Sequence, residues 1–536
     1  MTIDRRKFLA GTALGAVTAV LLNKQEAKAG NVSGYKPRFA MIFDQNKCVG
    51  CGACKEACSE TNHVPAGQLR MTLERQSPLD GTPGNRKYVR VSCQQCSEPP
   101  CVRVCPTGAA HIDPATNIVT MDNSRCVGCK YCIAGCPYNV RFINEETKAA
   151  ENCDFCLHTK LAIGEQPACV QACRYDALVF GDTNDPNSYI SKMLAVKNSV
   201  RVRAVLGTHP NLHYIPKLKG QRRIKRFDMQ TTDIVIDFTT GLSGSVAWPW
   251  PIAVYLFLAG ISGGAVALAI IINLYKGTHA DNPQMKAATM VGLVTILLGM
   301  VCLVLDLTDP FNFWRILIFY NPTSVMSIGV AALLFYIPLL FVLTLLVFRD
   351  LPILKFLKPL TDFLAHFRVV LDWVVMILAV VICAYTGFLI SALIRFPLIN
   401  TAVLPALFVA SGFSAGCAAI RLFAICFGAE REDSSMHILH VAEYPIILVE
   451  AMCIFMIAVS LITGTEVAKI AFSAFTTGVW AWVFWLGAIF VGMIVPITLS
   501  FFRSAACFYL SCISAIAGMM CLRLFILYAG QLNGLN

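Results

Sequence analysis

Sixteen of the 24 cysteines lie between Cys48 and Cys173 and form four groups of four. The groups are Cys48, Cys51, Cys54 and Cys58; Cys93, Cys96, Cys101 and Cys105; Cys126, Cys129, Cys132 and Cys136; and Cys153, Cys156, Cys169 and Cys173. The first and third have the spacing C-x2-C-x2-C-x3-C, and the other two lengthen only the middle gap. This spacing lets three thiolates reach one cubane while the fourth cysteine reaches the other cluster of a pair. The pattern therefore predicts four [4Fe-4S] clusters.

Disulfides and zinc are the competing interpretations of these cysteines. Four near-repeats of one cluster spacing are unusual for a disulfide framework. Zinc ribbons need pairs of C-x2-C, with no third cysteine two residues later. The stretch Cys48-Val49-Gly50-Cys51 also recurs as Cys126-Val127-Gly128-Cys129, which indicates duplicated ferredoxin-like modules.

Residues 48–185 resemble the four-cluster electron-transfer subunits of the NrfC type. The likeness includes Cys93-Gln94-Gln95-Cys96, Cys105-Pro106-Thr107-Gly108-Ala109 and Gln166-Pro167-Ala168-Cys169. It implies four ligand sets: Cys48, Cys51, Cys54 and Cys173; Cys153, Cys156, Cys169 and Cys58; Cys93, Cys96, Cys101 and Cys136; and Cys126, Cys129, Cys132 and Cys105. Arg174 replaces the usual proline after the last cysteine, so we expect Arg174→Pro to lower the potential of the adjacent cluster.

The composition indicates a membrane protein. Of the 536 residues, 56% are hydrophobic and only 14% are charged, and the mean hydropathy is +0.61. The net charge of +11 is typical of membrane loops and lipid contact, so we expect no nucleic-acid partner. Eight apolar runs of spanning length lie near 250–275, 286–305, 326–348, 368–392, 402–428, 438–463, 479–500 and 504–530.

This apolar region resembles the NrfD/PsrC-type integral membrane quinol oxidoreductases over residues 246–531. The likeness rests on fragments such as Leu305-Asp306-Leu307, Phe313-Trp314-Arg315, Asn321-Pro322-Thr323-Ser324 and Tyr385-Thr386-Gly387. The expected fold is an α+β ferredoxin-like iron-sulfur domain with duplicated two-cluster modules, followed by an all-α bundle of eight transmembrane helices. The expected domains are a signal peptide (1–29), a four-cluster domain (30–200), a basic linker (201–245) and a membrane domain (246–536).

The N-terminus predicts export. Arg5 and Arg6 precede a short apolar run, and Ala27-Lys28-Ala29 suits cleavage, as in twin-arginine signals. The iron-sulfur domain would then lie on the periplasmic side of a bacterial inner membrane. Eight basic residues of the alternate loops would face the cytoplasm, against Arg315, Arg395 and Lys469 outside.

Four residues of the apolar runs are candidates for membrane chemistry. Tyr255 lies about 8 Å below the outer end of its span, Tyr385 lies near the outer end of another, and Asp306 ends the second span. We expect both tyrosines to hydrogen-bond quinone oxygens and Asp306 to accept or relay protons, with interfacial anchoring as the alternative for the tyrosines. Glu450 lies within a span, where it serves either a proton path or a structural ion pair. Because no histidine falls in the middle of a span, we expect no haem b.

These features predict a quinol-oxidising enzyme component that uses menaquinol or ubiquinol. Electrons would pass through the clusters to a separate periplasmic reductase of the nitrite, sulfite or polysulfide type. Because this sequence shows no recognisable C-x-x-C-H motif or molybdopterin pocket, we expect the terminal reduction to take place on a separate subunit, a multihaem cytochrome c or a molybdopterin enzyme. The alternatives are a membrane anchor that conducts electrons without a quinone site, or the same chain working in reverse to reduce quinone.

Overall fold

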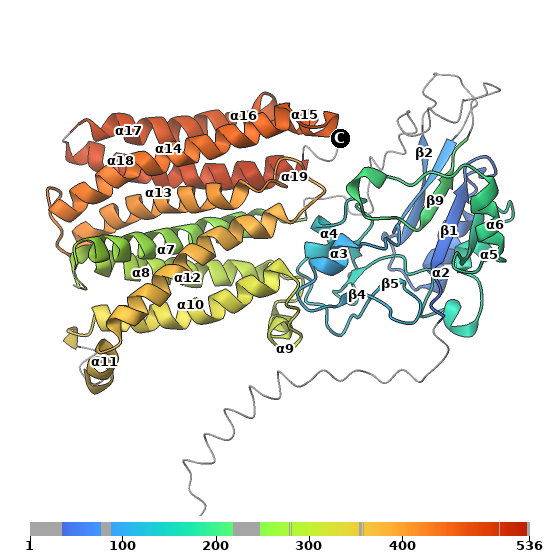
Figure 1. Ribbon diagram of the computed structural model, residues 1–536, viewed down its shortest axis with the longest axis horizontal. Coiled ribbons are helices and arrows are strands. Elements are labelled where there is room, and N and C mark those ends of the chain that lie inside the picture. The colour runs from blue at the N-terminus through green and yellow to red at the C-terminus, as the bar shows by residue number, and fades with distance from the viewer. Residues whose placement is uncertain are drawn as a thin grey trace, which may run out of the picture.

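The computed structural model describes residues 35–76, 87–217, 247–277, 279, 281–352, 356, 358–502 and 504–532. It has two parts, a smaller one of strands and short helices and a block of long helices, lying end to end (Figure 1). The expected signal peptide and most of the expected basic linker fall outside the described residues.

The smaller part contains a three-stranded sheet. Its central strand β1 (Phe39–Asp44) pairs antiparallel with β8 (Leu178–Asp182) and parallel with β9 (Leu212–Ile215). Five of the six residues of β1 are buried, as expected for an apolar strand with partners on both sides. Because Phe43 is opposite Leu178, the pairing brings the chain just before the first cysteine group next to the chain just after the last.

Short hairpins and helices alternate between these strands. The hairpins are β2 (Met71–Gln76) with β3 (Lys87–Ser92), β4 (Ala110–Ile112) with β5 (Val119–Met121), and β6 (Phe142–Ile143) with β7 (Ala150–Glu151). The helices are α2 (Ala53–Thr61), α3 (Pro100–Arg103), α4 (Tyr131–Ala134), α5 (Ala168–Gln171) and α6 (Tyr189–Val196), with 3₁₀ turns at Leu161–Ile163 and Ala204–Leu206. Each of the first four helices carries the third cysteine of one group, so the sequence repeat is also a structural repeat.

Eight helices of the described residues are long and apolar enough to cross a membrane, as the sequence predicted. Six are α7 (Trp250–Tyr275), α8 (Pro283–Leu305), α10 (Val325–Val347), α12 (Arg368–Ser391), α13 (Leu404–Ala424) and α14 (Ser434–Ile462). The seventh joins α16 (Gly478–Trp482), a π-helical stretch (Val483–Ile494) and α17 (Val495–Ser500). The eighth joins α18 (Ala505–Leu524), a π-helical stretch (Phe525–Ala529) and α19 (Gly530–Leu532). The connections contain α9 (Arg315–Ile318), α11 (Lys358–Ala365), α15 (Glu466–Phe472) and 3₁₀ turns at Pro310–Asn312, Ile425–Phe427 and Ser473–Phe475.

Helices α7 and α13 form the centre of this block. In the most apolar windows of α7 and of the span containing α13, 83% and 72% of the residues are buried, against 28% for α14. Glycines permit the close crossing, because a Cβ added to Gly264 would lie 2.0 Å from the carbonyl oxygen of Gly412. Small residues serve this purpose in membrane helix packing, where lipid gives no hydrophobic drive for association.

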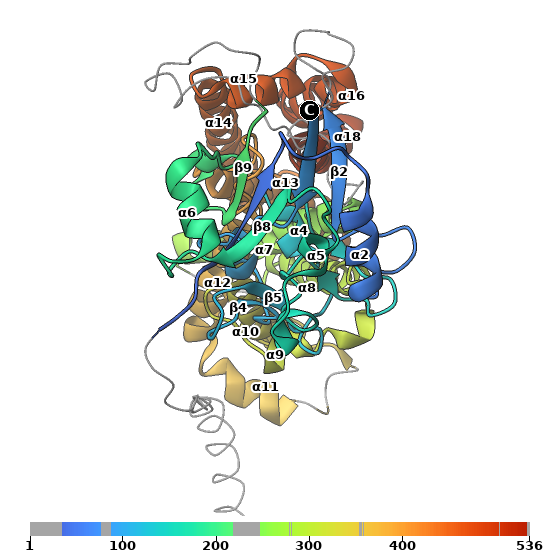
Figure 2. The same ribbon diagram turned by 90° about the vertical axis from the view of Figure 1, so that its right-hand side faces the viewer.

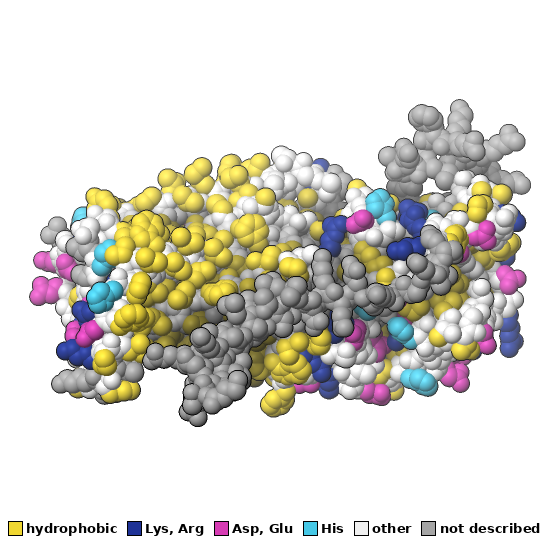
Figure 3. Space-filling model, turned by 60° about the horizontal axis from the view of Figure 1, so that its bottom comes forward, with side chains coloured by type: hydrophobic (Ala, Val, Ile, Leu, Met, Phe, Trp, Pro, Cys, Tyr) yellow, Lys and Arg dark blue, Asp and Glu magenta, His cyan; other side chains and the backbone are white. Residues whose placement is uncertain are grey.

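The surface of the long helices is suited to lipid. Figure 3 shows hydrophobic side chains covering this block, whereas charged side chains gather at its far end and on the smaller part. Exposed members of the apolar surface include Leu298, Val301, Phe455 and Leu486. A continuous apolar surface of this extent matches a block that spans a bilayer.

The smaller part is docked on one end of the helical block. It contacts the start of α7 and α10, the end of α12 and the loop after α8. Figure 2 looks along the helices from this end, with the smaller part in front.

Candidate functional site

The four cysteine groups share one backbone turn. In each C-x2-C, the residue before the second cysteine has a positive φ: 75° at Gly50, 48° at Gln95, 68° at Gly128 and 56° at Phe155. The N–H of this residue donates a hydrogen bond to the first cysteine of its group. Gln95 and Phe155 adopt the left-handed conformation without being glycine, which costs free energy and is typical of functional sites. Backbone N–H groups arranged in this way favour an anionic sulfur.

The sixteen thiols gather into four sets, each combining three cysteines of one group with one of another. The larger electrostatic contacts between the thiols join Cys48, Cys51, Cys54 and Cys173; Cys58, Cys153, Cys156 and Cys169; Cys93, Cys96, Cys101 and Cys136; and Cys105, Cys126, Cys129 and Cys132. Smaller ones connect neighbouring sets, Cys169 with Cys54 and Cys101 with Cys105 and Cys132. These are the sets that the family resemblance implies. Their service as cluster ligands stays a prediction.

The chemistry of these sets fits an iron-sulfur cube. A cavity lies among the four cysteines of the third set and is lined also by Arg141. None of the 24 cysteines forms a disulfide. Among the described residues, no group of three or more His, Cys, Asp or Glu side chains is arranged to hold a single metal ion. Thiolates around a cube must be farther apart than the ligands of one zinc ion, which lie about 2.3 Å from their metal.

The fourth set, containing Cys129, faces the helical block. Trp248 Nε1 donates to the carbonyl oxygen of Cys129 (3.3 Å), Arg315 Nη1 to that of Cys126 (2.9 Å) and Asn321 Nδ2 to that of Cys105 (2.8 Å). The helical block therefore holds three peptide carbonyls of this set directly. The sequence identified Arg315 and Asn321 within family-like fragments but gave them no such role.

Two serines extend this attachment. Ser324 and Ser327, at the start of α10, donate from Oγ to the carbonyl oxygens of Val104 (2.7 Å) and Pro106 (2.9 Å). Both serines are buried. Since Val104 and Pro106 flank Cys105, these bonds fix the same set from a second side.

Tyr255 and Tyr385 come together beside the fourth set. Tyr385 on α12 lies close enough to Tyr255, Tyr131 and Cys129 to interact with them electrostatically. The hydroxyl of Tyr255 is buried and has no hydrogen-bond partner among the described residues. Gly329 makes room for Tyr385, since a Cβ at Gly329 would lie 1.8 Å from Tyr385 Cζ. The two tyrosines therefore lie together beside the cysteine set nearest the helical block, while their chemical roles stay a prediction.

Asp306 follows the last residue of α8 and faces the same set. Its carboxylate lies 3.8 Å from Lys130 Nζ, and its carbonyl oxygen accepts a hydrogen bond from that nitrogen at 3.3 Å. Burial raises the pKa of Asp306 to about 6, although Lys130 acts in the opposite direction. The carboxyl group can therefore exchange a proton near neutral pH.

Glu450 lies apart from these three residues, on α14. It is twelve residues from the end of its helix, or about 18 Å along the axis. Arg523 lies near enough to interact electrostatically, but no ion pair within 4.0 Å joins them. The ion pair that α14 forms with its neighbour is Glu443 with Arg421.

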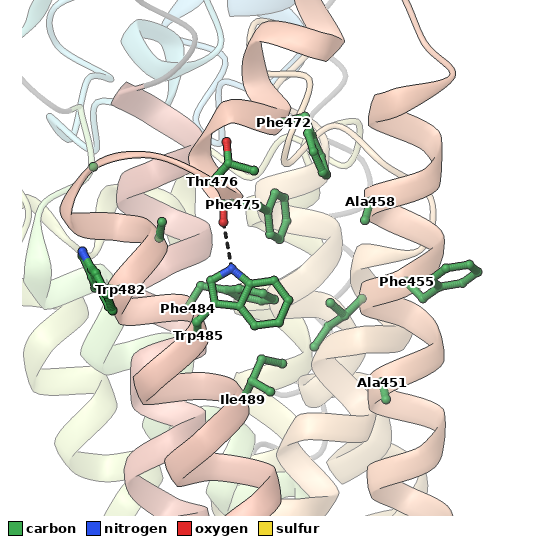
Figure 4. A pocket seen from close by; sticks show the side chains of 13 residues that line it. Ala451, Phe455, Ala458, Phe472, Phe475, Thr476, Trp482, Phe484, Trp485 and Ile489 are labelled. Carbon is green, nitrogen blue, oxygen red and sulfur yellow. Dashed lines mark hydrogen bonds between the residues drawn. The ribbon is translucent and has the colours of Figure 1, made fainter.

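A larger apolar cavity lies elsewhere in the block, between α14 and the seventh span. It measures about 690 Å³ and is lined by residues such as Phe455, Phe475, Trp482 and Trp485 (Figure 4). Two of its polar side chains already have partners, because Trp485 Nε1 donates to the carbonyl oxygen of Phe475 (2.8 Å) and Thr476 Oγ1 to that of Ser473 (3.2 Å). The cavity suits a hydrocarbon chain better than a quinone headgroup.

Comparison with family models matches both parts of the chain. Residues 239–533 match the model described as polysulphide reductase, NrfD. Residues 85–183 match a 4Fe-4S dicluster domain, and residues 41–59 match a 4Fe-4S binding domain.

Relatives of known name cover the two parts separately. Protein NrfC of Escherichia coli (strain K12) is 46% identical over 222 residues, which is 41% of this chain and 99% of the relative. The B subunit of polysulfide reductase from Wolinella succinogenes is 46% identical over 186 residues, 34% of this chain and 96% of that subunit. The C subunit of the same reductase is 40% identical over 301 residues, 54% of this chain and 95% of that subunit.

Proposed function

Since the chain belongs to the NrfD polysulphide reductase family, we propose that it oxidises membrane quinol and passes the electrons through four [4Fe-4S] clusters to a periplasmic terminal reductase. It is an iron-sulfur electron-transfer protein and a multi-pass integral membrane protein, related to components of polysulfide reductase. What its relatives carry on separate polypeptides, this protein carries on one, so the iron-sulfur and membrane parts are present in equal number.

The observation that carries the proposal is the position of Tyr385, which is near Tyr255, Tyr131 and Cys129 at once. Electron transfer requires the donor to be close to the first acceptor. A quinol held by the two tyrosines would lie beside the fourth cysteine set, whose peptide carbonyls accept hydrogen bonds from the helical block.

In this proposal the chain's own residues bind and deprotonate the quinol. Tyr255 and Tyr385 hydrogen-bond its two oxygens, and the unpartnered hydroxyl of Tyr255 is available for such a bond. Oxidation of one quinol to quinone releases two electrons and two protons. Asp306 accepts protons in turn and returns them to the outer side, next to the fixed charge of Lys130. The clusters, held by the four cysteine sets described above, supply one-electron acceptors in series.

The electrons leave at the opposite end of the iron-sulfur domain. Cys51 is the exposed member of the sixteen cysteines, and Cys48 and Cys173 of the same set are half-buried. Val49 and Tyr175 beside them are 50% exposed. A soluble catalytic subunit could approach this set closely, and it would be a multihaem cytochrome c or a molybdopterin enzyme that reduces nitrite, sulfite or polysulfide.

We place the iron-sulfur domain in the periplasm of a bacterium, with the helices in the inner membrane. The domains proposed for this arrangement are those expected from the sequence: 1–29, 30–200, 201–245 and 246–536. Arg315 and Arg395, two of the three basic residues expected on the outer side, support the placement of the iron-sulfur domain on that side. Arg315 bonds to Cys126, and Arg395 lies near Cys136, so both belong to the docking surface rather than to free loops.

Addition of a quinol analogue to the purified, anaerobic protein tests the proposal. The clusters should be reduced, with loss of their visible absorption, and the protein should contain about 16 iron and 16 sulfide per chain. Reduction by dithionite but not by any quinol would identify the chain as an anchor and conduit. Reduction of quinone by the prereduced protein, without the forward reaction, would establish the opposite direction.

A further inference from the structure

Two arginines of the iron-sulfur domain are buried without a carboxylate. Arg90 on β3 is 0% exposed and Arg141 is 1% exposed. Among the described residues, neither forms an ion pair with an Asp or Glu side chain. Arg90 Nε and Arg141 Nη2 have no hydrogen-bond partner within that part of the chain. A buried guanidinium in this state is costly unless another negative charge lies close to it.

Arg70, a half-buried arginine of the same domain, has carboxylate partners. Its guanidinium pairs with Glu151 at 3.0 Å and with Asp154 at 3.2 Å. Carboxylates are therefore available in this fold where a buried arginine needs a structural partner. Arg90 and Arg141 have a different kind of neighbour.

The neighbours of Arg90 are thiols of the first and second cysteine sets. Its Nη2 lies 3.8 Å from Cys153 Sγ, and Nη1 contacts the sulfur of Met41. Electrostatic contacts join it to Cys54 of the first set and to Cys153 and Cys169 of the second. Arg90 therefore lies between the two sets.

Arg141 occupies the corresponding place in the other pair. It lines the cavity enclosed by Cys93, Cys96, Cys101 and Cys136 of the third set. Electrostatic contacts join it to Cys101 and Cys136 of that set and to Cys132 of the fourth. Its Nη1 donates to the sulfur of Met121 at 3.0 Å.

We propose that Arg90 and Arg141 are the fixed counter-charges of the two cluster pairs, and that each raises the reduction potentials of both clusters that it separates. A cluster with four thiolate ligands carries net negative charge, and reduction adds one more. A buried cation between two such groups therefore favours the reduced state of each. The inference rests on the four-cluster part of the proposed function.

The test is a redox titration followed by electron paramagnetic resonance on the intact, detergent-purified chain. The variants are Arg90→Gln and Arg141→Gln, with Arg90→Lys and Arg141→Lys keeping the charge. Arg174→Gln is the matched control, because Arg174 follows the ligand Cys173 but is exposed to solvent. Iron and sulfide are measured first in every sample.

Arg90→Gln should lower the equilibrium constant for reduction of two clusters by about tenfold or more, which is 59 mV for a one-electron couple. Arg141→Gln should lower the equilibrium constant for reduction of the other two clusters by the same factor. The potentials should shift less in the lysine variants than in the glutamine variants. Arg174→Gln should lower the equilibrium constant for reduction of its cluster by less than about threefold, since water screens an exposed charge. This keeps the direction expected for Arg174→Pro from the sequence and reduces its size, because the side chain is exposed.

Three outcomes would overturn the inference. The first is unchanged reduction potentials in the glutamine variants that keep their full iron content. The second is a shift in Arg174→Gln as large as the shifts in Arg90→Gln and Arg141→Gln. The third is loss of iron from both the lysine and the glutamine variants, which would assign the two arginines a packing role. A wild-type chain without the expected iron would contradict the four-cluster proposal and this inference with it. Full iron with unmoved potentials contradicts this inference alone.

Discussion

The hydroxyl of Tyr131 donates a hydrogen bond of 2.7 Å to the carbonyl oxygen of Leu389. Tyr131 lies between Cys129 and Cys132, and Leu389 lies one helical turn after Tyr385 on α12. The indole of Trp248 packs against Tyr131, with ring centroids 4.9 Å apart. This contact fixes the distance between the proposed quinol site and the cysteine set nearest to it.

Replacement of either proposed quinol-binding tyrosine by phenylalanine should slow reduction by quinol. One hydrogen bond of about 0.5–1.5 kcal/mol is lost, which lowers the rate about tenfold at the upper limit. Stopped-flow absorbance after mixing with a quinol analogue measures it, and dithionite reduction should be unaffected. Tyr336→Phe is the control, because Tyr336 is equally buried but bonds to Ser262 at 3.0 Å. Equal rates in Tyr255→Phe, Tyr385→Phe and Tyr336→Phe would remove the tyrosines from the site.

A methyl group at Gly329 should disable the site without touching a cysteine. It would overlap the ring of Tyr385 at 1.8 Å, whereas a methyl group at Gly299 would lie 3.3 Å from Tyr255 Cδ2, a tight contact that a small shift relieves. We therefore expect Gly329→Ala to lose most quinol-driven reduction and Gly299→Ala to lose little. Iron content should stay at the wild-type level in both. The reverse order of the two effects would contradict this geometry.

The rate of quinol oxidation should rise with pH through about 6 and then level off. Asp306 accepts a proton only as a carboxylate, and burial raises its pKa to about 6. Asp306→Asn should give a lower rate with no inflection there. Because Lys130 lowers this pKa, Lys130→Met should move the inflection to higher pH. A pH profile that is the same in wild type and Asp306→Asn would exclude this carboxylate as the acceptor.

Glu450→Gln distinguishes a proton path from a structural pair. A relay residue should lower quinol turnover about tenfold or more while the clusters and the protein yield are kept. Glu443→Gln is the comparison, because it breaks the buried pair with Arg421, a loss of about 3–5 kcal/mol that should reduce the amount of folded protein. If Glu450→Gln assembles as poorly as Glu443→Gln and its remaining protein turns over normally, the relay is wrong.

The sequence predicted the features that depend on local patterns. Cysteine spacing and hydropathy identified the four groups and the eight spans because both signals repeat within short windows. The π-helical stretch Val483–Ile494 was not predicted, since its apolar run is the same in an α-helix and in a π-helix. The stretch packs against the last span, where the ring centroids of Phe484 and Phe525 lie 4.9 Å apart.

Contacts between distant segments could not be predicted in this way. Asn321 and Ser324 belong to a family-like fragment of the sequence that predicts no contact for them, yet they bond to the peptide chain around Cys105. The arginine singled out by the sequence was Arg174, next to a cysteine in the chain, and it is exposed. Arg90 was overlooked because β3 is buried on both faces near its end, so alternation gives no signal that a charged side chain points inward.

Photoaffinity labelling with a quinone that carries an azide on its ring tests the central claim most directly. The label competes with unlabelled quinol and is located by mass spectrometry of the peptides. The account predicts labelling of the segments around Tyr255 and Tyr385, at the end of the bundle that contacts Cys129. Labelling confined to residues 472–489, which line the apolar cavity between α14 and the seventh span, would contradict it.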